Sequence, residues 1–159
     1  MIVVRQVDYL ELRDRQALLD VLDAYSRDPM GAGHPLAEDV RARLCDDLSR
    51  IPGAVSFLAW AEDLPVGLIN GFLGYSTFKA RPLINVHDIA VVRAWRGRGV
   101  ARQLLQALQD YARELGCCKL TLEVLSGNRR ARQAYISFGF EDYALDPDAG
   151  TAIFMQKWL

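Results

Sequence analysis

The chain has 159 residues, 51% of them hydrophobic, and its 19 Lys and Arg nearly balance its 20 Asp and Glu, giving a formal net charge of -1. This length predicts a single domain over residues 1–159, and the apolar content excludes a disordered chain. The charge argues against nucleic acid as a partner, because phosphate binding normally requires a basic excess. The sequence has no run of about 18 uncharged apolar residues and no signal peptide at residues 1–10, so we expect no membrane partner.

A strand and two helices are predicted at the N-terminus. Residues 1–7 are β-branched and alternate loosely, which is typical of a strand. Apolar residues at helical spacing predict helices over 9–25 and 36–51. The segment between these helices, 27–35, contains two prolines and two glycines and is therefore predicted to be a loop.

The rest of the chain predicts an antiparallel meander followed by alternating helices and strands. A tight turn is expected at Asp63 and Leu64, and the strongest helix ends at Gly116. A last helix is closed by Gly139. In order, the predicted elements are strands 56–62, 65–78 and 83–92, helix 100–115, strand 119–125, helix 128–138, and a terminal hairpin of strands 140–145 and 151–158. The fold class is therefore α/β.

The three cysteines indicate neither a disulfide framework nor a metal site. Cys117 and Cys118 are neighbours, Cys45 lies far away, and no Cys/His spacing typical of metal ligands is present. We therefore expect structural thiols, no metal, and a reducing cytoplasm as the compartment.

The segment Arg96-Gly97-Arg98-Gly99-Val100-Ala101 lies between a predicted strand and the strongest helix. Its two glycines let main-chain N–H groups converge, and the helix that follows adds its N-terminal N–H groups and positive dipole end. Such a cluster of donors binds phosphate oxygens, and Arg96, Arg98 and Arg102 can add charge-assisted contacts. The alternative is a glycine-rich turn with solvated arginines. The segment fits neither a P-loop nor a dinucleotide fingerprint, since it lacks a Lys-Ser/Thr pair and a third glycine.

Two motifs resemble those of the GNAT superfamily of N-acetyltransferases. The first is Asp88-Ile89-Ala90-Val91-Val92 followed by the glycine segment 96–101, which is similar to the acetyl-CoA signature of that family, with Ala101 in place of its more frequent last glycine. The second combines Leu122-Glu123-Val124, Asn128, Ala131, Tyr135 and Phe138-Gly139-Phe140. The element order also matches over essentially the whole chain.

The resemblance implies a mixed sheet of six to seven strands, flanked by about four helices and splayed between two central parallel strands that end near Val92 and Leu125. Exposed backbone on the first of these strands would bind the pantetheine arm of acetyl-CoA, and the pyrophosphate would lie on Gly97 to Arg102. The cofactor-binding residues implied in this way are Ile89, Ala90, Val91, Arg96, Gly97, Arg98, Gly99, Val100, Ala101, Arg102, Asn128 and Ala131.

Acetyl transfer to an amine needs a proton acceptor and a proton donor. An ammonium group with a pKa of about 10.4 is almost fully protonated at pH 7, and presenting the free amine costs about 4.6 kcal/mol. His87 is our first candidate base, Asp88 the second and Glu123 a weaker third, with water as a further alternative. Neighbours on a strand point to opposite faces, so we expect only one of His87 and Asp88 to face the amine. Tyr135 is the candidate acid for the departing thiolate, a role that the resemblance implies.

The predicted function is acetyl transfer from acetyl-CoA to a primary amine of a small molecule by direct attack. The loop around Tyr25 to Leu36 and the strand residues from Phe72 to Phe78 are expected to form the acceptor pocket. In these pocket segments the resemblance to the GNAT superfamily is weaker than in the two motifs. It is nearest to the diamine and thialysine acetyltransferase branch, which acetylates small amines. The alternatives are a protein or peptide acetyltransferase and a non-catalytic acyl-CoA sensor. A homodimer is also expected, with Trp95 and Trp158 as candidate contacts.

Overall fold

The computed structural model describes residues 1–144 and 146–159. Its elements fall in two compact units, residues 1–122 and 123–159, each described separately below. In chain order they are β1 (Ile2–Gln6), α1 (Leu12–Ser26), α2 (Glu38–Arg50), β2 (Ala54–Ala61), β3 (Leu64–Ser76), β4 (Arg81–Val91), the 3-10 turn η1 (Arg93–Trp95), α3 (Val100–Glu114), β5 (Leu120–Leu122), α4 (Arg129–Phe138) and the 3-10 turn η2 (Pro147–Ala149). None of the helices in the described ranges is long and apolar enough to cross a membrane.

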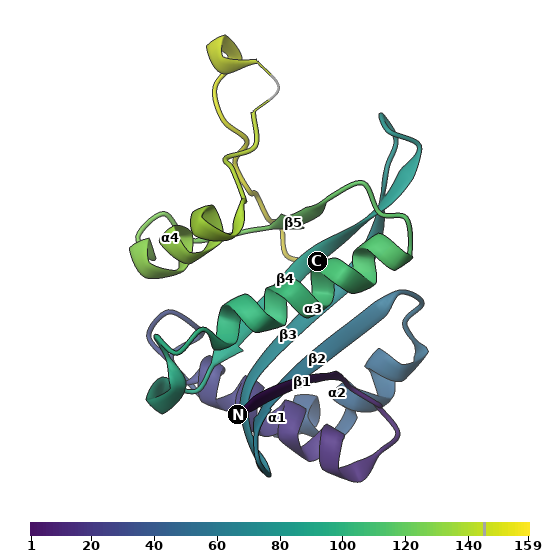
Figure 1. Cartoon of the computed structure of the whole chain (residues 1–159), viewed down its shortest axis with the longest axis vertical. Coiled ribbons are helices and arrows are strands. Elements are labelled where there is room, and N and C mark those ends of the chain that lie inside the picture. The colour runs from purple at the N-terminus through teal and green to yellow at the C-terminus, as the bar shows by residue number, and fades with distance from the viewer. Residues whose placement is uncertain (145) are drawn as a thin grey trace. The chain divides into compact units, whose positions relative to one another are not determined.

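The sheet of the first unit has the order β1-β2-β3-β4-β5 (Figure 1). All neighbours pair antiparallel except β4 and β5, which are parallel. The meander and the parallel pair confirm the predicted topology. The β2–β3 turn is one residue earlier than predicted: Glu62 has a left-handed φ of 56°, and β3 already begins at Leu64.

The two faces of the sheet are covered by different helices. On one face, Leu18 of α1 and Leu48 of α2 pack in a core with Leu58 and Leu68 of the sheet. On the other face, β3 carries glycine where α3 approaches closely: a Cβ on Gly67 would lie 2.9 Å from Val100 Cγ1. The fully buried leucines of α3 each contribute about 1.5–3 kcal/mol from burial; they are Leu104, Leu105 and Leu108.

Strand β4 has two irregularities, and both lie next to the predicted site. Its pairing with β3 shifts between Asn70 and Gly71, which face Asp88 and Val86, so that His87 is an extra, bulged residue. Its parallel pairing with β5 covers only Ile84–Val86, whereas β4 continues to Val91. Pairing restricted to three residues is what a splayed sheet requires.

In the second unit, α4 has the predicted ends. The side-chain oxygen of Asn128 accepts a hydrogen bond from Ala131 N at 3.2 Å, which caps the helix, and Gly139 ends it with a φ of 115°. Tyr135 packs edge-on against Phe140, with ring centroids 6.0 Å apart.

The predicted terminal hairpin is wrong for the residues that the structure describes, so the sheet has five strands where six to seven were expected. Residues 140–144 and 151–158 form no strand, although Ala152 N donates a hydrogen bond to the carbonyl of Tyr143 at 3.1 Å. Leu145, part of that prediction, lies outside the described residues. A two-stranded hairpin is marginal without a sheet or helix to cover it, and the side chains of Ile153 and Phe154 are exposed. β5 is likewise shorter than the predicted 119–125.

Candidate active site

The glycine segment forms a tight, left-handed bend directly before α3. Gly97 and Gly99 have φ values of 79° and 78°, which favour glycine because an L side chain is strained there. Gly99 is also the N-cap of α3 and has no side chain to bind the first N–H groups of the helix. A Cβ on Gly99 would meet nothing within 4 Å, so the surface is open on the side of Gly99 where a side chain would project. Open main-chain donors at the positive end of a helix suit a phosphate group.

The arginines of this segment have different surroundings. Arg96 donates to the carbonyl of Val91 at 3.0 Å and forms an ion pair with Asp28 at 2.7 Å. The Arg98 guanidinium stacks on the ring of Trp95 at 4.9 Å. Arg102 lies in the first turn of α3 with Val100 and Ala101. The Arg96 side chain therefore joins the end of β4 to the loop between α1 and α2, and its predicted contact with a phosphate stays a prediction.

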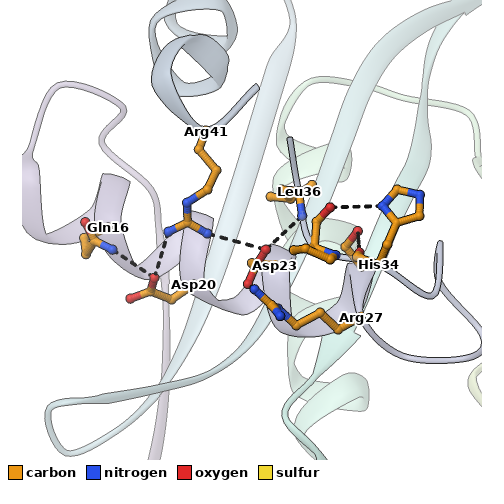
Figure 2. Close-up of polar contacts among 9 residues, drawn as sticks. Gln16, Asp20, Asp23, Arg27, His34, Leu36 and Arg41 are labelled. Carbon is orange, nitrogen blue, oxygen red and sulfur yellow. Dashed lines mark hydrogen bonds and ion pairs between the residues drawn. The ribbon is translucent and has the colours of Figure 1, made fainter. Parts of the chain in front are cut away.

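The loop between α1 and α2 is held by polar contacts at its base (Figure 2). The Asp23 carboxylate accepts a hydrogen bond from Arg27 at 2.8 Å and from Leu36 N at 2.9 Å. Both hydrogen bonds lower the pKa of this carboxyl, the one from Arg27 more strongly. Arg41 of α2 reaches back to Asp23 at 3.6 Å. The His34 ring lies 3.0 Å from the carbonyl of Pro35. The predicted loop is thus confirmed, and its polar contacts fix both ends on the flanking helices.

Asp28 is the link between this loop and Arg96. Its carboxyl accepts from Met30 N at 3.0 Å as well as from Arg96. The Met30 N–H and, after it, the Arg96 side chain lower the pKa of Asp28, so the group is ionised at neutral pH. The expected acceptor pocket contains both Asp28 and Met30, and the ion pair brings this part of its wall beside the glycine segment.

His87 and Asp88 lie on the same face of the sheet, which corrects the expectation that they face opposite sides. The His87 ring packs edge-on against Phe72 at 5.4 Å, and Asp88 accepts from Asn70 Nδ2 at 3.0 Å. Phe72 and Asn70 are two residues apart on β3 and therefore share a face. The bulge at His87 shifts the alternation of β4 by one residue, which a sequence pattern does not reveal.

Asp88 is the end of a chain of polar side chains that crosses the α1–α2 face of the sheet. Asn70 Oδ1 accepts from Ser56 Oγ at 2.6 Å, and Ser56 Oγ lies 2.8 Å from the hydroxyl of Tyr9. Ser56 and Asn70 are 1% and 4% exposed. Sequence reasoning missed these residues; the available signal was the one serine of β2 and the one asparagine of β3, each with apolar residues on both sides.

Tyr25, at the end of α1, lies close enough to the two acids to sense both charges. Its pKa is raised by burial and further by the carboxylates of Asp88 and Asp28. Tyr25 is therefore a neutral hydroxyl that can donate a hydrogen bond. The predicted pocket residues Tyr25 and Asp28 and the candidate base Asp88 thus belong to one neighbourhood.

The remaining candidates lie in or next to the second unit. Tyr135 is half-buried on α4, seven residues after its cap Asn128. Glu123 follows β5 instead of lying on it as predicted.

Among the cysteines, Cys45 and Cys117 have thiol pKa values that are raised first of all by burial, which keeps them protonated. This agrees with a structural role for them.

A model of the acetyltransferase (GNAT) family matches residues 18–140. The thialysine N-epsilon-acetyltransferase of Bos taurus is 35% identical over 71 residues, which are 45% of this chain and 41% of that protein. The chain thus spans less than half the length of that relative. The aminoglycoside N(6')-acetyltransferase type 1 of Salmonella typhimurium is 24% identical over 119 residues, 73% of this chain and 81% of its own.

The fold has counterparts among solved structures. The aminoglycoside N-acetyltransferase AAC(6')-Iy, solved in complex with CoA, superposes with a TM-score of 0.74 at 21% identity, over 99% of this chain and 95% of that one. At this identity the likeness concerns the fold alone. The glycine bend, the parallel β4–β5 pair and the family match over residues 18–140 agree, and the chain belongs to the acetyltransferase (GNAT) family.

Proposed function

We propose that this chain is an N-acetyltransferase that uses acetyl-CoA and acetylates a primary amine of a small molecule. The observation that carries the proposal is the bend formed by the left-handed glycines Gly97 and Gly99 directly before α3, with open space where a Gly99 side chain would lie. Relatives named for thialysine and aminoglycoside acetylation support an amine as the acceptor.

The cofactor would be held mainly by main-chain groups. Its pyrophosphate fits the donors of residues 97–102, and its pantetheine arm fits the edge of β4 at Ile89, Ala90 and Val91, where the described pairing with β5 has ended. The Val91 carbonyl already accepts from Arg96, which fixes the end of that edge. Asn128 and Ala131 are proposed to contribute from the start of α4. Bound acetyl-CoA supplies the acetyl thioester.

The acceptor must first lose one proton from its ammonium form to solvent, because only the free amine has a lone pair for the attack. One further proton then leaves the attacking nitrogen, and one reaches the sulfur. As the amine nitrogen bonds to the thioester carbon, its proton becomes strongly acidic, and a nearby carboxylate or imidazole can take it. We assign the acceptor role to Asp88, whose carboxylate Asn70 holds, and keep His87, on the same face, as the alternative. When the carbon–sulfur bond breaks, the Tyr135 hydroxyl is proposed to donate its proton to the departing thiolate.

The acidic wall favours a cationic acceptor. Asp28 is ionised and Tyr25 is a neutral donor beside it and Asp88. An amine approaches such a site as an ammonium ion and is attracted by the carboxylates. We therefore propose a small polar amine as the acceptor, as in polyamines, diamino acids or aminoglycosides.

The test is calorimetric titration with acetyl-CoA, followed by thiol release across a panel of polyamines, amino acids and aminoglycosides in the same buffer. Micromolar binding with turnover on one class of amine is expected. Binding without turnover on any member of the panel would overturn the small-amine acceptor and favour a protein substrate or an acyl-CoA sensor. Absence of binding would overturn the cofactor assignment itself.

A further inference from the structure

Three neighbouring strands carry polar side chains at matching positions in an otherwise apolar layer. Ser56 pairs with Asn70 across β2 and β3, and Asn70 pairs with Asp88 across β3 and β4. Two residues further along each strand, the same face carries Leu58, Leu68 and Ala90, all buried in the core under α1 and α2. Burying a serine and an asparagine in such a layer is costly unless each polar atom is paired, and here the hydrogen bonds run in series.

The hydrogen bonds have a single direction, which ends at Asp88. Asn70 donates through Nδ2 to the carboxylate at 3.0 Å, which leaves its Oδ1 to accept from Ser56 at 2.6 Å. Ser56 has one hydroxyl proton and uses it on Asn70, so the contact at 2.8 Å is a donation from Tyr9 to Ser56. Burial raises the pKa of Tyr9, which keeps this first donor protonated. A chain of donors in series polarises each member toward the last acceptor.

This direction suits a carboxylate at the end of the series, because an ionised carboxyl oxygen accepts the Asn70 N–H more strongly than the carbonyl of a protonated acid does. We propose that Tyr9, Ser56 and Asn70 are positioning residues that orient the Asp88 carboxylate for proton transfer from the acceptor amine. This role rests on the proposed function. Apolar residues of similar size would fill the same positions of the core without any polar contact, so packing alone does not require the chain.

The other titratable and charged groups on this side must be separated from Asp88 in the test. They are Tyr25 at the end of α1, Asp28 in the loop with its partner Arg96, and His87 next to Asp88 on β4. His87 is the main confounder, since an imidazole ordinarily titrates near neutral pH. The measurements below are therefore made in parallel in a His87→Gln background.

The decisive variants are Asn70→Leu and Tyr9→Phe. Asn70→Leu keeps the approximate volume and removes the donor that orients the carboxylate, so kcat should fall by about 10-fold while the Kd for acetyl-CoA stays unchanged. Tyr9→Phe removes one hydroxyl at the far end of the hydrogen-bonded series and should lower kcat by less. Tyr143→Phe is the matched control, because this tyrosine lies in the second unit and its side chain is exposed.

The carbon NMR signal of the Asp88 carboxyl is recorded at pH 7 in the unliganded protein, because it responds to loss of a hydrogen bond, and kcat is measured beside it. An unchanged carboxyl signal in folded Asn70→Leu and in Tyr9→Phe overturns the proposal, whether or not any amine is turned over. If Asn70→Leu fails to fold, Tyr9→Phe decides. A failed amine panel with a changed carboxyl signal overturns only the proposed function. In an Asp88→Asn background, Tyr9→Phe should cause no further loss of kcat. An additive loss would also contradict the proposal that Tyr9 acts through Asp88.

Discussion

The bulge of β4 lies before the end of that strand and the glycine bend lies after it, but different groups form the two regions. The bend presents main-chain N–H groups, and its shape comes from two neighbouring glycines with positive φ. The bulge presents the side chains of His87 and Asp88, and the position of Asp88 depends on partners 18 and more residues away in the sequence.

The difference teaches which changes each region tolerates. A backbone site is sensitive to a side chain placed in its path and little affected by loss of the side chains around it. A side-chain site that rests on a buried chain of hydrogen bonds loses function when any one polar atom is removed. We therefore expect substitutions in the bend to change acetyl-CoA binding and substitutions at the bulge to change turnover.

The largest effect on acetyl-CoA binding is expected for Gly99→Glu. The new side chain places bulk and negative charge in the open space before the N–H groups, so the Kd for acetyl-CoA should rise by at least about 100-fold, or about 2.7 kcal/mol. Gly116→Glu is the control, because Gly116 has a φ of 72° and equally open surroundings at the other end of α3. Both variants carry left-handed strain of about 1–2 kcal/mol. Calorimetry that finds normal binding in Gly99→Glu would remove the pyrophosphate from this bend.

Asp88→Asn is expected to lower kcat by about 10²- to 10³-fold without changing the Kd for acetyl-CoA, because it removes a proton acceptor and leaves the bend intact. His87→Gln should lower kcat less, since this ring contacts Phe72 and not the buried polar chain. Steady-state kinetics on the best amine compares the two. A larger loss in His87→Gln makes the imidazole the acceptor and reverses the assignment.

The bend and much of the architecture were predictable because their signals are local. The ends of α4 follow from its caps Asn128 and Gly139, and the end of α3 from Gly116, which follows the C-cap Leu115 with a φ of 72°. The order of the strands follows from patterns of a few residues. Helix caps and turns depend on φ and on hydrogen bonds within four residues, which a sequence displays directly.

The bulge and the polar chain were not predictable because they depend on register. Strict alternation placed His87 and Asp88 on opposite faces, and one extra residue in β4 put them on the same face. Ser56 and Asn70 acquire a role only once the β2–β3 register sets them side by side. The terminal hairpin failed for a related reason: alternating apolar residues predict a strand, but a strand also needs a partner.

Tyr135→Phe tests proton donation to the departing thiolate, to which neither the glycine bend nor the bulge of β4 contributes. Loss of the hydroxyl should lower kcat about 10-fold with little change in acetyl-CoA affinity, because the ring and its contact with Phe140 are kept. Tyr143→Phe in the same unit is the matched control. Equal kcat values for wild type and Tyr135→Phe, measured by thiol release, would remove this tyrosine from the mechanism.

Asp28→Asn removes the ion pair between the α1–α2 loop and Arg96 of the glycine segment, and it leaves the backbone of both segments unchanged. Asn can still accept from Met30 N but loses the ion pair with Arg96, so the KM for the amine should rise about threefold to tenfold and acetyl-CoA binding should change little. The pKa of Asp28 is lowered in the folded protein, so its stabilising effect is full above the unfolded value of about 3.9 and is lost as the pH falls through the lower folded value.

Urea unfolding at pH 7 and near pH 3 checks that sign. Wild type should be more stable than Asp28→Asn at pH 7, and the difference should shrink toward pH 3. Asp20→Asn on α1, whose carboxyl is half exposed, is the control for the same chemical change. A difference that grows toward low pH contradicts the ion pair as the source of the stability.

Arg98→Ala should have the smallest effect. Arg98 stacks on Trp95, and the main-chain donors beside it stay in place when its side chain is removed. An exposed charge contributes about 0.2–1 kcal/mol, so the Kd for acetyl-CoA should rise about threefold, and less at high salt. Arg113→Ala, in the last turn of α3, controls for loss of one positive charge. A 100-fold rise for Arg98→Ala would mean that this region also binds through its side chains, and the contrast between a backbone site and a side-chain site would fail.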